Sequence, residues 1–324
     1  MQDDAIQADH LQRFIFDNAA IRGEWVQLKQ TWQTVKVQRE YPPAVAGLLG
    51  EMLAAAALLA ETVKMSGRLV LQCRSDGPVS LLMVECTSDH TLRGLANWEG
   101  EIADDATMQQ MLGDGNLAIT IENVEAKQPY QGIVSVQGES IAEMLEMYFA
   151  QSEQLKTRIW LSTDEQTAGG LQQLPDQDPE QHDENWTRIN FLADTVTYEE
   201  LLNLDAVSLL YRLFNEEMVR LLSTTVLEFA CTCSRQRVAD TFKLLGLLIK
   251  NTISASFPIR QYFTLYPAIP GSPWDGANVK ISALNWPQFY PAKTSIFMIP
   301  VWPKSNRLPI RFCWVITPFL ITIF

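Results

Sequence analysis

Two cysteines separated by one residue form the most concentrated chemical feature of the chain. Cys231 and Cys233 follow the apolar stretch 225–230 and precede a basic run that contains Arg235 and Arg237. Two thiols at this spacing can both reach a soft metal ion, or can be oxidised together, and neighbouring arginines favour the reactive and ligating thiolate. Taken alone the pair is a weak signal, because two incidental cysteines give the same pattern.

The other three cysteines do not extend this pair into a recognisable metal site. A closed structural zinc site needs four ligands, and the next cysteine, Cys313, lies 80 positions beyond Cys233. Cys73 and Cys86 fall inside apolar, strand-like patterns, so we interpret them as core residues. Five cysteines in 324 residues are also too few for a disulfide-stapled scaffold, which favours a reducing compartment.

Motifs of the common enzyme classes are weak or missing in the sequence. It has no Gly-x-Ser-x-Gly nucleophile motif and no Gly-Lys-Ser/Thr phosphate loop. The three histidines, His10, His90 and His182, each lie in a polar or loop-like setting, so a catalytic histidine is not favoured. Residues 113–115 (Gly-Asp-Gly) lack the third glycine of a dinucleotide fingerprint, and we expect a hairpin turn there.

The overall charge argues against one class of partner. The chain has 38 Asp and Glu against 25 Lys and Arg, a formal net charge of −13. A phosphate-backbone binder needs a clustered cationic surface, so we do not expect nucleic acid as a partner. The N-terminus carries Asp3, Asp4 and Asp9 where a secretory signal would be basic and then apolar, and we expect a cytoplasmic protein.

An apolar run, residues 52–60, lies between Glu51 and Glu61. It is nine residues long, whereas a membrane-spanning helix needs about 20 apolar residues. We therefore expect a buried, alanine-rich core helix over residues 43–64 and no membrane association.

From residue 67 onward the hydrophobic pattern changes to a period of two, which is typical of strands. Residues 75–78 (Ser-Asp-Gly-Pro) predict the turn of a hairpin between strands 68–73 and 79–85. Helix or loop is predicted before residue 23, a helix at 140–149, and a turn at Gly169 and Gly170. The other predicted strands are residues 23–28, 91–98, 116–122, 132–136 and 157–162. Helices and strands alternate without βαβ regularity, so the predicted fold class is α+β, with mixed or antiparallel sheets and packed helices.

A polar, acidic segment at residues 174–185 indicates a solvated linker. Beyond it Thr197 and Glu200 form a predicted capping box, and Asp205 can cap a second helix. These linker helices, at about 195–222, are too short to form a core of their own, so we expect them to pack on the first domain.

The composition changes sharply near residue 241. Residues 241–324 contain one acid, Asp275, and eight bases, whereas residues 1–240 contain 37 acids and 17 bases. The same tail holds ten of the 16 prolines, so we expect few helices or central strands in it. Two unlike sequences have been joined.

Eight strings across the first 240 residues resemble the 33 kDa chaperonin family, the redox-regulated bacterial holdase chaperones. They are collinear with the family over about residues 10–245, and several are long enough to be specific. The strings are residues 75–82 (SDGPVSLL), 92–96 (LRGLA), 112–120 (LGDGNLAIT), 130–134 (YQGIV), 148–158 (YFAQSEQLKTR), 168–170 (AGG), 209–217 (LLYRLFNEE) and 229–237 (FACTCSRQR).

The resemblance implies a cytoplasmic, ATP-independent chaperone with an α+β core, a helical linker and a small C-terminal zinc domain. In the family, a Cys-x-Cys and a later Cys-x-x-Cys hold zinc as four thiolates in the quiet, reduced state. Oxidation pairs the cysteines as disulfides, expels the metal and unfolds the small domain and the linker, so that the dimerised protein holds unfolding clients. The ligand and redox roles transfer here only to Cys231 and Cys233.

The chain departs from the family where the second cysteine pair should come, because it contains no Cys-x-x-Cys. Two thiolates cannot close a tetrahedral site, so we expect only weak zinc binding at Cys231 and Cys233. The loss coincides with the change of composition. Our hypothesis is that the reading frame shifted near residues 245–249, which rereading the gene in the other frames for a Cys-x-x-Cys will check; a fused apolar extension is the less favoured alternative.

The sequence therefore predicts four regions: an α+β chaperone core at 1–173, a linker with short helices at 174–228, a truncated or aberrant zinc-type remnant at 229–246, and an atypical tail at 247–324. The expected function is a holdase whose thiol switch is incomplete, with unfolding proteins as partners, a homodimer on oxidation and no catalysis. Two alternatives remain open: a structural or regulatory binding module, and a small-ligand enzyme on the acidic α+β core.

Overall fold

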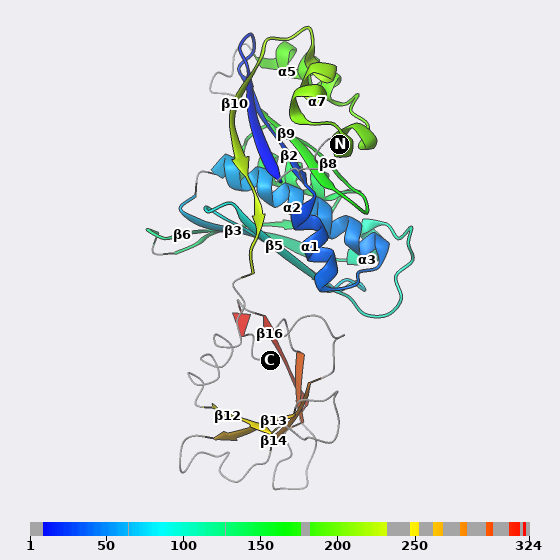
Figure 1. The fold of residues 1–324 in the computed structure, drawn as a ribbon, viewed down its shortest axis with the longest axis vertical. Helices are drawn as coiled ribbons and strands as arrows, with labels where there is room; N and C mark the ends of the chain where they lie inside the picture. The colour runs from blue at the N-terminus through cyan, green and yellow to red at the C-terminus, as the bar shows by residue number, and fades with distance from the viewer. Residues whose placement is uncertain are drawn as a thin grey trace, which may run out of the picture. The chain divides into compact units, whose positions relative to one another are not determined.

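The computed structural model describes residues 9–63, 65–126, 128–175 and 182–231, together with six strands between residues 247 and 321. The chain divides into two compact units, Met1–Cys231 and Thr232–Phe324 (Figure 1). The first unit combines two β-sheets with helices. The predicted α+β class with mixed and antiparallel sheets is confirmed.

The first sheet has five strands in the order β10-β1-β2-β9-β8, and every neighbouring pair is antiparallel. Only β2 and β8 match strands that the sequence predicts. The strands are β1 (His10–Phe16), β2 (Ile21–Leu28), β8 (Arg158–Thr163), β9 (Ala168–Pro175) and β10 (Val219–Val226).

The second sheet has six strands in the order β11-β5-β4-β3-β6-β7, in which only β11 and β5 run parallel. Its predicted hairpin is confirmed as β3 and β4, and the other strands predicted between residues 91 and 136 are confirmed as β5, β6 and β7. The strands are β3 (Gly67–Ser75), β4 (Leu81–Thr87), β5 (Thr91–Asn97), β6 (Gly115–Asn123), β7 (Tyr130–Ser135) and β11 (Glu228–Phe229).

The helix α2 (Pro43–Val63) packs against both sheets and is the centre of the core. Its Leu49, Leu53 and Leu58 are fully buried in one cluster with Val26 of β2 and Leu71 of β3. Complete burial of each such leucine contributes about 1.5–3 kcal/mol. By length and composition α2 could cross a membrane, but 67% of its most apolar window is buried, so the predicted core helix is confirmed.

The remaining helices lie around the two sheets. Three of them, α5, α6 and α7, form a layer on the first sheet. The two predicted helix caps are confirmed: the Thr197 hydroxyl accepts a hydrogen bond from Glu200 N at 3.2 Å, and the Asp205 carboxylate accepts one from Ser208 N at 3.0 Å. The helices are α1 (Gln30–Gln38), α3 (Met108–Leu112), α4 (Ile141–Tyr148) with the π-helical turn η1 (Phe149–Glu153), α5 (His182–Ala193), α6 (Tyr198–Asn203) and α7 (Ala206–Phe214).

Neither of the two glycine turns predicted from the sequence is found in the structure as predicted. Gly169 and Gly170 lie inside β9, where a Cβ would stand 3.0 Å from the Leu201 carbonyl oxygen and 2.8 Å from Leu58 Cδ1. Glycine is needed there because two helices approach the strand closely. Gly113, with φ of 57°, ends α3 and leads into β6, so residues 113–115 join a helix to a strand instead of forming a hairpin.

Three further expectations about local structure are corrected. Residues 10–16, where helix or loop was expected, form β1 in a hairpin with β2. The polar segment 174–185 is shorter than expected, because β9 extends to Pro175 and α5 begins at His182, while residues 176–181 lie outside the described part. The last residues of the predicted linker helices, from residue 219 onward, belong to strand β10, which pairs with β1.

The second unit contains more strands than its prolines suggested. Six short strands pair antiparallel in chain order. Pro267 and Pro300 are the last residues of their strands, positions that proline tolerates. The strands are β12 (Leu247–Thr252), β13 (Tyr262–Pro267), β14 (Val279–Ala283), β15 (Ile296–Pro300), β16 (Arg311–Thr317) and β17 (Leu320–Ile321).

A carboxyl group, Glu24 on β2, is buried in the interior of the first unit. Its side chain is 2% exposed, and its Oε2 has no hydrogen-bond partner. The charged groups around it are Arg22 on the same strand, Arg13 on β1 and Glu61 on α2, and Gln172 of β9 lies directly opposite. Burial raises the pKa of Glu24 to about 7, because it outweighs the attraction of the two arginines.

We expect Glu24→Gln to stabilise the protein at pH 8. The folded-state pKa lies above the ordinary value of 4.5, so the folded state binds more protons between pH 4.5 and about 7 and the wild type loses stability as the pH rises through that window. The gain at pH 8 should be on the order of 3 kcal/mol, measured by urea unfolding at pH 5 and pH 8. Glu99→Gln, at an exposed position, is the control; an unchanged pH slope in Glu24→Gln would contradict the assignment.

Candidate redox and metal centre

The chain reaches Cys231 through two consecutive edge strands. β10 pairs with β1 at the edge of the first sheet, and β11 pairs with β5 at the edge of the second. Between them the N–H of Leu227 donates to the carbonyl oxygen of Asp9 at 2.8 Å, so main-chain bonding continues across the change of sheet. We call residues 219–230 the bridging strand; Figure 1 shows it running past both sheets.

Hydrogen bonds hold the bridging strand at several points. The Gln12 carboxamide donates from Nε2 to the Leu222 carbonyl at 3.0 Å and accepts from Thr224 Oγ1 at 2.6 Å. Further along, the N–H groups of Glu228 and Ala230 donate to carbonyl oxygens beside and within β5, both at 3.1 Å. Most β10 side chains are exposed, so hydrogen bonds, each contributing about 1 kcal/mol, supply most of the attachment of β10, while Leu227 beyond it is buried in the main hydrophobic cluster. Such a strand opens at a lower free energy than the core.

The structure places one of the two predicted site residues. Cys231 is partly exposed and follows directly after the bridging strand, whereas Cys233 and the basic run lie outside the described residues. Within the described part of the chain, no group of three or more His, Cys, Asp or Glu side chains is arranged to hold a metal ion. The donor set therefore does not fit a closed four-ligand zinc site, because Cys231 and Cys233 supply at most two thiolates.

The cysteines of the core are more deeply buried than Cys231. Cys73 on β3 and Cys86 on β4 are buried in the main hydrophobic cluster, which confirms their interpretation as core residues. Burial raises the pKa of each thiol to about 12. Both thiols are therefore protonated at neutral pH and are poor nucleophiles and ligands.

An apolar seam joins the helical layer to the first sheet. Phe14 and Phe16 of β1 contact Phe214 of α7, with ring centroids 6.5 Å and 5.0 Å apart. Leu209 and Leu213 of α7 are buried in the same cluster. We call this cluster the seam. Its sheet-side residues were not found from the sequence, because β1 was not predicted as a strand.

Polar contacts fasten the outside of the helical layer. Arg212 of α7 lies 2.7 Å from Glu200 of α6, and Arg158 of β8 lies 2.8 Å from Asp194, which also accepts from Trp160 Nε1 at 3.0 Å. These groups are partly exposed, and surface ion pairs of this kind contribute about 0–1 kcal/mol each. Burial of the seam therefore supplies most of the attachment of the layer.

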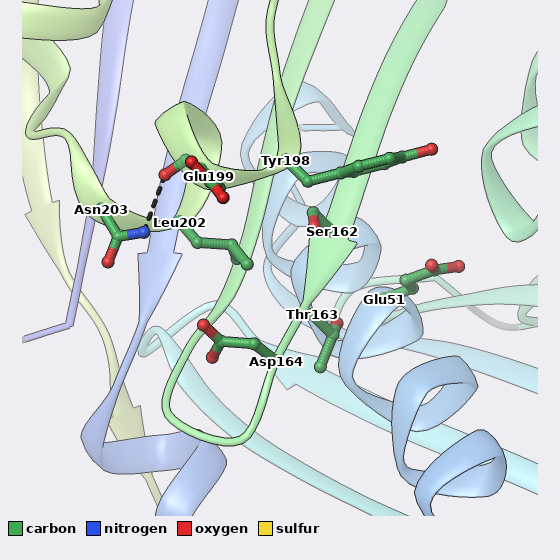
Figure 2. Close-up of a pocket in the computed structure, with 8 residues that line it drawn as sticks. All are labelled: Glu51, Ser162, Thr163, Asp164, Tyr198, Glu199, Leu202 and Asn203. Atoms are coloured by element: carbon green, nitrogen blue, oxygen red, sulfur yellow. Dashed lines mark hydrogen bonds between the residues drawn. The ribbon is translucent and has the colours of Figure 1, made fainter. Parts of the chain in front are cut away.

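A pocket of 480 Å³ lies between α2, β8 and α6 (Figure 2). Burial raises the pKa of Glu51 to about 7, although part of this side chain still faces the pocket. Asp164 accepts the N–H groups of Gln166 and Thr167 at 2.7 and 2.6 Å, so its carboxylate closes the turn between β8 and β9. No histidine or cysteine is among the lining residues, which are Glu51, Ser162, Thr163, Asp164, Tyr198, Glu199, Leu202 and Asn203.

The fold of the chain is that of a known class of chaperone. A crystal structure titled 33 kDa chaperonin (heat shock protein 33 homolog) from Thermotoga maritima matches it with a TM-score of 0.63, over 80% of this chain and 95% of that one, at 20% sequence identity. At this identity the likeness concerns the fold alone.

Sequence comparisons establish the family. A family model described as Hsp33 protein matches residues 9–250. The 33 kDa chaperonin of Nitrosococcus oceani is 48% identical over 240 residues, and that of Ectopseudomonas mendocina is 50% identical over 244; each match covers 74% of this chain and 82% of the relative. The chain belongs to the Hsp33 family of chaperones, and the predicted resemblance is confirmed. Residues 251–324 lie beyond the family match.

We expect Cys231 to be alkylated by iodoacetamide in the native protein at pH 8, while Cys73 and Cys86 react only after unfolding. At this pH a thiol of pKa 12 is ionised in roughly one molecule in ten thousand, and both core thiols are also sterically covered. Peptide mass spectrometry with and without urea measures the three rates. Comparable native rates at Cys73 and Cys231 would contradict the distinction between core and site thiols.

Proposed function

We propose that this chain is an ATP-independent holdase of the cytoplasm, which binds unfolding proteins and prevents their aggregation under oxidative and heat stress. Its thiols Cys231 and Cys233 form half of a redox switch. The observation that carries the proposal is the position of Cys231 directly after the bridging strand, which is bonded to the edges of both sheets. A chemical change at the thiols acts at the end of a strand whose β10 side chains are mostly exposed.

The proposed redox step forms one disulfide. Hydrogen peroxide accepts two electrons from the two thiols, the S–S bond forms between Cys231 and Cys233, and two molecules of water carry away the protons and the oxygen atoms. A disulfide within three residues constrains the backbone tightly. We propose that this constraint opposes the extended path that leads out of β11, and so favours release of the bridging strand.

Release of the bridging strand would loosen the helical layer as well. Residues 215–218 connect α7 to β10, and within this connection Glu217 accepts from Asn18 Nδ2 at 2.8 Å and forms an ion pair with Arg188 of α5. If the layer moves away, Phe14 and Phe16 of the seam become exposed. An exposed aromatic face can hold an unfolding chain, and it can also be covered by a second copy of this chain, which is the proposed homodimer.

Zinc binding is not required for the proposed switch. Two thiolates leave two tetrahedral positions to water or to another chain, so we propose weak zinc binding at Cys231 and Cys233. When bound, zinc would hold the two thiols reduced. No step of the proposed switch depends on the metal, because the attachment of the bridging strand and of the seam is made by this chain's own residues.

The direct test is light scattering from a thermally unfolding client, with the full chain either reduced or treated with peroxide. We expect peroxide to increase protection by the wild type and to have no such effect on Cys231→Ser, which cannot form the disulfide. Equal protection in both states would contradict the switch and leave a constitutive holdase. An absence of protection in both states would overturn the proposed function itself.

A second test weakens the seam without oxidation. Leu213→Ala removes a buried side chain of α7 and should cost about 2–5 kcal/mol of attachment. We expect the reduced variant to protect the client as well as the oxidised wild type does. Tyr211→Ala on the same helix is the matched control, because Tyr211 is 72% exposed. Equal behaviour of the two variants in the reduced state would contradict a role for the seam in holding clients.

A further inference from the structure

The four edges of the two sheets are protected to very different degrees. At the β8 edge, the Glu146 carboxylate accepts the N–H of Ile159 at 2.8 Å. The β10 edge is interrupted by an irregularity in its register with β1, and it carries Arg220, which pairs with Asp17. β11 is only two residues long. Bulges, charges and short length are the usual means by which proteins keep sheet edges from pairing with other chains.

β7 has none of these protections. It pairs with β6 over six residues in continuous register, and its sequence, Tyr-Gln-Gly-Ile-Val-Ser, contains neither charge nor proline. Among the described residues no other segment forms a backbone hydrogen bond with β7 beyond its pairing with β6. The neighbouring strand β6 is labelled at the side of the second sheet in Figure 1.

The register shows which backbone groups are left open. Val136 N–H donates to the Gly115 carbonyl at 2.9 Å, and antiparallel bonding alternates along the strand from that pair. Gly132 and Val134 therefore bond to β6, while the N–H and C=O groups of Gln131, Ile133 and Ser135 point away from it. These three residues are exposed, and Ile133 is 61% exposed.

The opposite face of β7 is held firmly. A Cβ on Gly132 would lie 2.3 Å from the ring of Tyr148, so the ring at the end of α4 rests directly on the strand. The hydroxyl groups of Tyr130 and Tyr148 lie 3.0 Å apart, and both donate to Glu153 of η1, at 2.6 and 2.7 Å. The open edge is thus fixed in an extended conformation before any partner arrives, which lowers the entropy cost of binding.

We propose that β7 is a client-binding edge, to which an extended segment of an unfolding protein adds as a further strand. This inference deepens the proposed holdase function and rests on it. Backbone pairing requires only an extended chain, which is a property that unfolding clients of different sequence share. The β6 side chains that lie opposite Ser135, Ile133 and Gln131 are Asn116, Ala118 and Thr120, all uncharged. The edge therefore accepts clients of either charge, although residues 1–240 carry 37 acids and 17 bases.

The test uses the full chain, oxidised by peroxide, with two variants at one position. Ile133→Pro removes an outward N–H but none of the bonds to β6, and Ile133→Lys adds a charge to the edge. Val124→Lys, in the turn before β7, is the matched control because Val124 is 84% exposed. We expect Ile133→Pro to require about fivefold more chaperone for half-maximal protection of a thermally unfolding client, the scale of one lost hydrogen bond. Ile133→Lys should also require more chaperone, because its charge must lose water in the pairing, and the control should match the wild type.

Hydrogen exchange supplies an independent readout. With reduced and carboxymethylated α-lactalbumin as a permanently unfolded client, the amides of Gln131, Ile133 and Ser135 should gain protection in the complex. The amides of Gly132 and Val134 are bonded to β6 already and should change little. Circular dichroism and thermal unfolding of each variant confirm that a lost activity does not reflect a lost fold.

The outcomes separate this inference from the function on which it rests. If the wild type protects clients and both Ile133 variants protect equally well, with no added protection at the three outward amides, the edge is not a client site and the holdase function stands. If the wild type protects nothing, the proposed function fails first. If Ile133→Pro converts a dimer into monomers without changing client protection, β7 pairs with a second copy, and the inference is overturned.

Discussion

The hydrogen-bonding groups at the edges of the two sheets are the constraint on which the rest of the first unit depends. A sheet edge leaves N–H and C=O groups without a partner, and in a folded protein these must be bonded, covered or left to water. The bridging strand forms one edge of each sheet, because β10 borders the first sheet and β11 the second. Its loss would open both sheets together, which links the two halves of the core to the residues that precede Cys231.

The helical layer depends on the same strand through the geometry of β1. β1 is bonded to β10 on one side and to β2 on the other, and it carries Phe14 and Phe16 of the seam. Short helices such as α6 and α7 are not stable alone, so their order derives from packing on this face. In the proposed opening, the attachments that are lost are hydrogen bonds of exposed strands and a single apolar seam, while α2 keeps the two sheets together through a much larger buried cluster.

The sequence predicted the parts of the fold in which pattern and packing agree. α2 and the hairpin of β3 and β4 follow from an apolar run and a period of two, and the caps Thr197 and Asp205 follow from local chemistry that needs no tertiary context. Gly169 and Gly170 were misassigned because their reason is the approach of Leu58 and Leu201, which are distant in sequence. β10 was missed because its pairing with β1 spans about 200 residues, and nothing local distinguishes its leucines from those of a helix. The same limit applies to the candidate site, since spacing indicated Cys231 and Cys233 as candidates but could not indicate the strand that leads to Cys231.

The missing second cysteine pair affects which interactions could hold the proposed switch in its inactive state. In a site with four thiolates, metal binding supplies folding energy directly, and the ligands then determine the stability of the segment that carries them. Here the described residues offer no such cluster, and the family match ends at residue 250. In the proposed switch, the closed state is stabilised by interactions within the first unit, which are those of the bonded edge strands and of the seam. The balance between the closed and open forms in the proposed switch is then set by local packing on the first sheet more than by a metal.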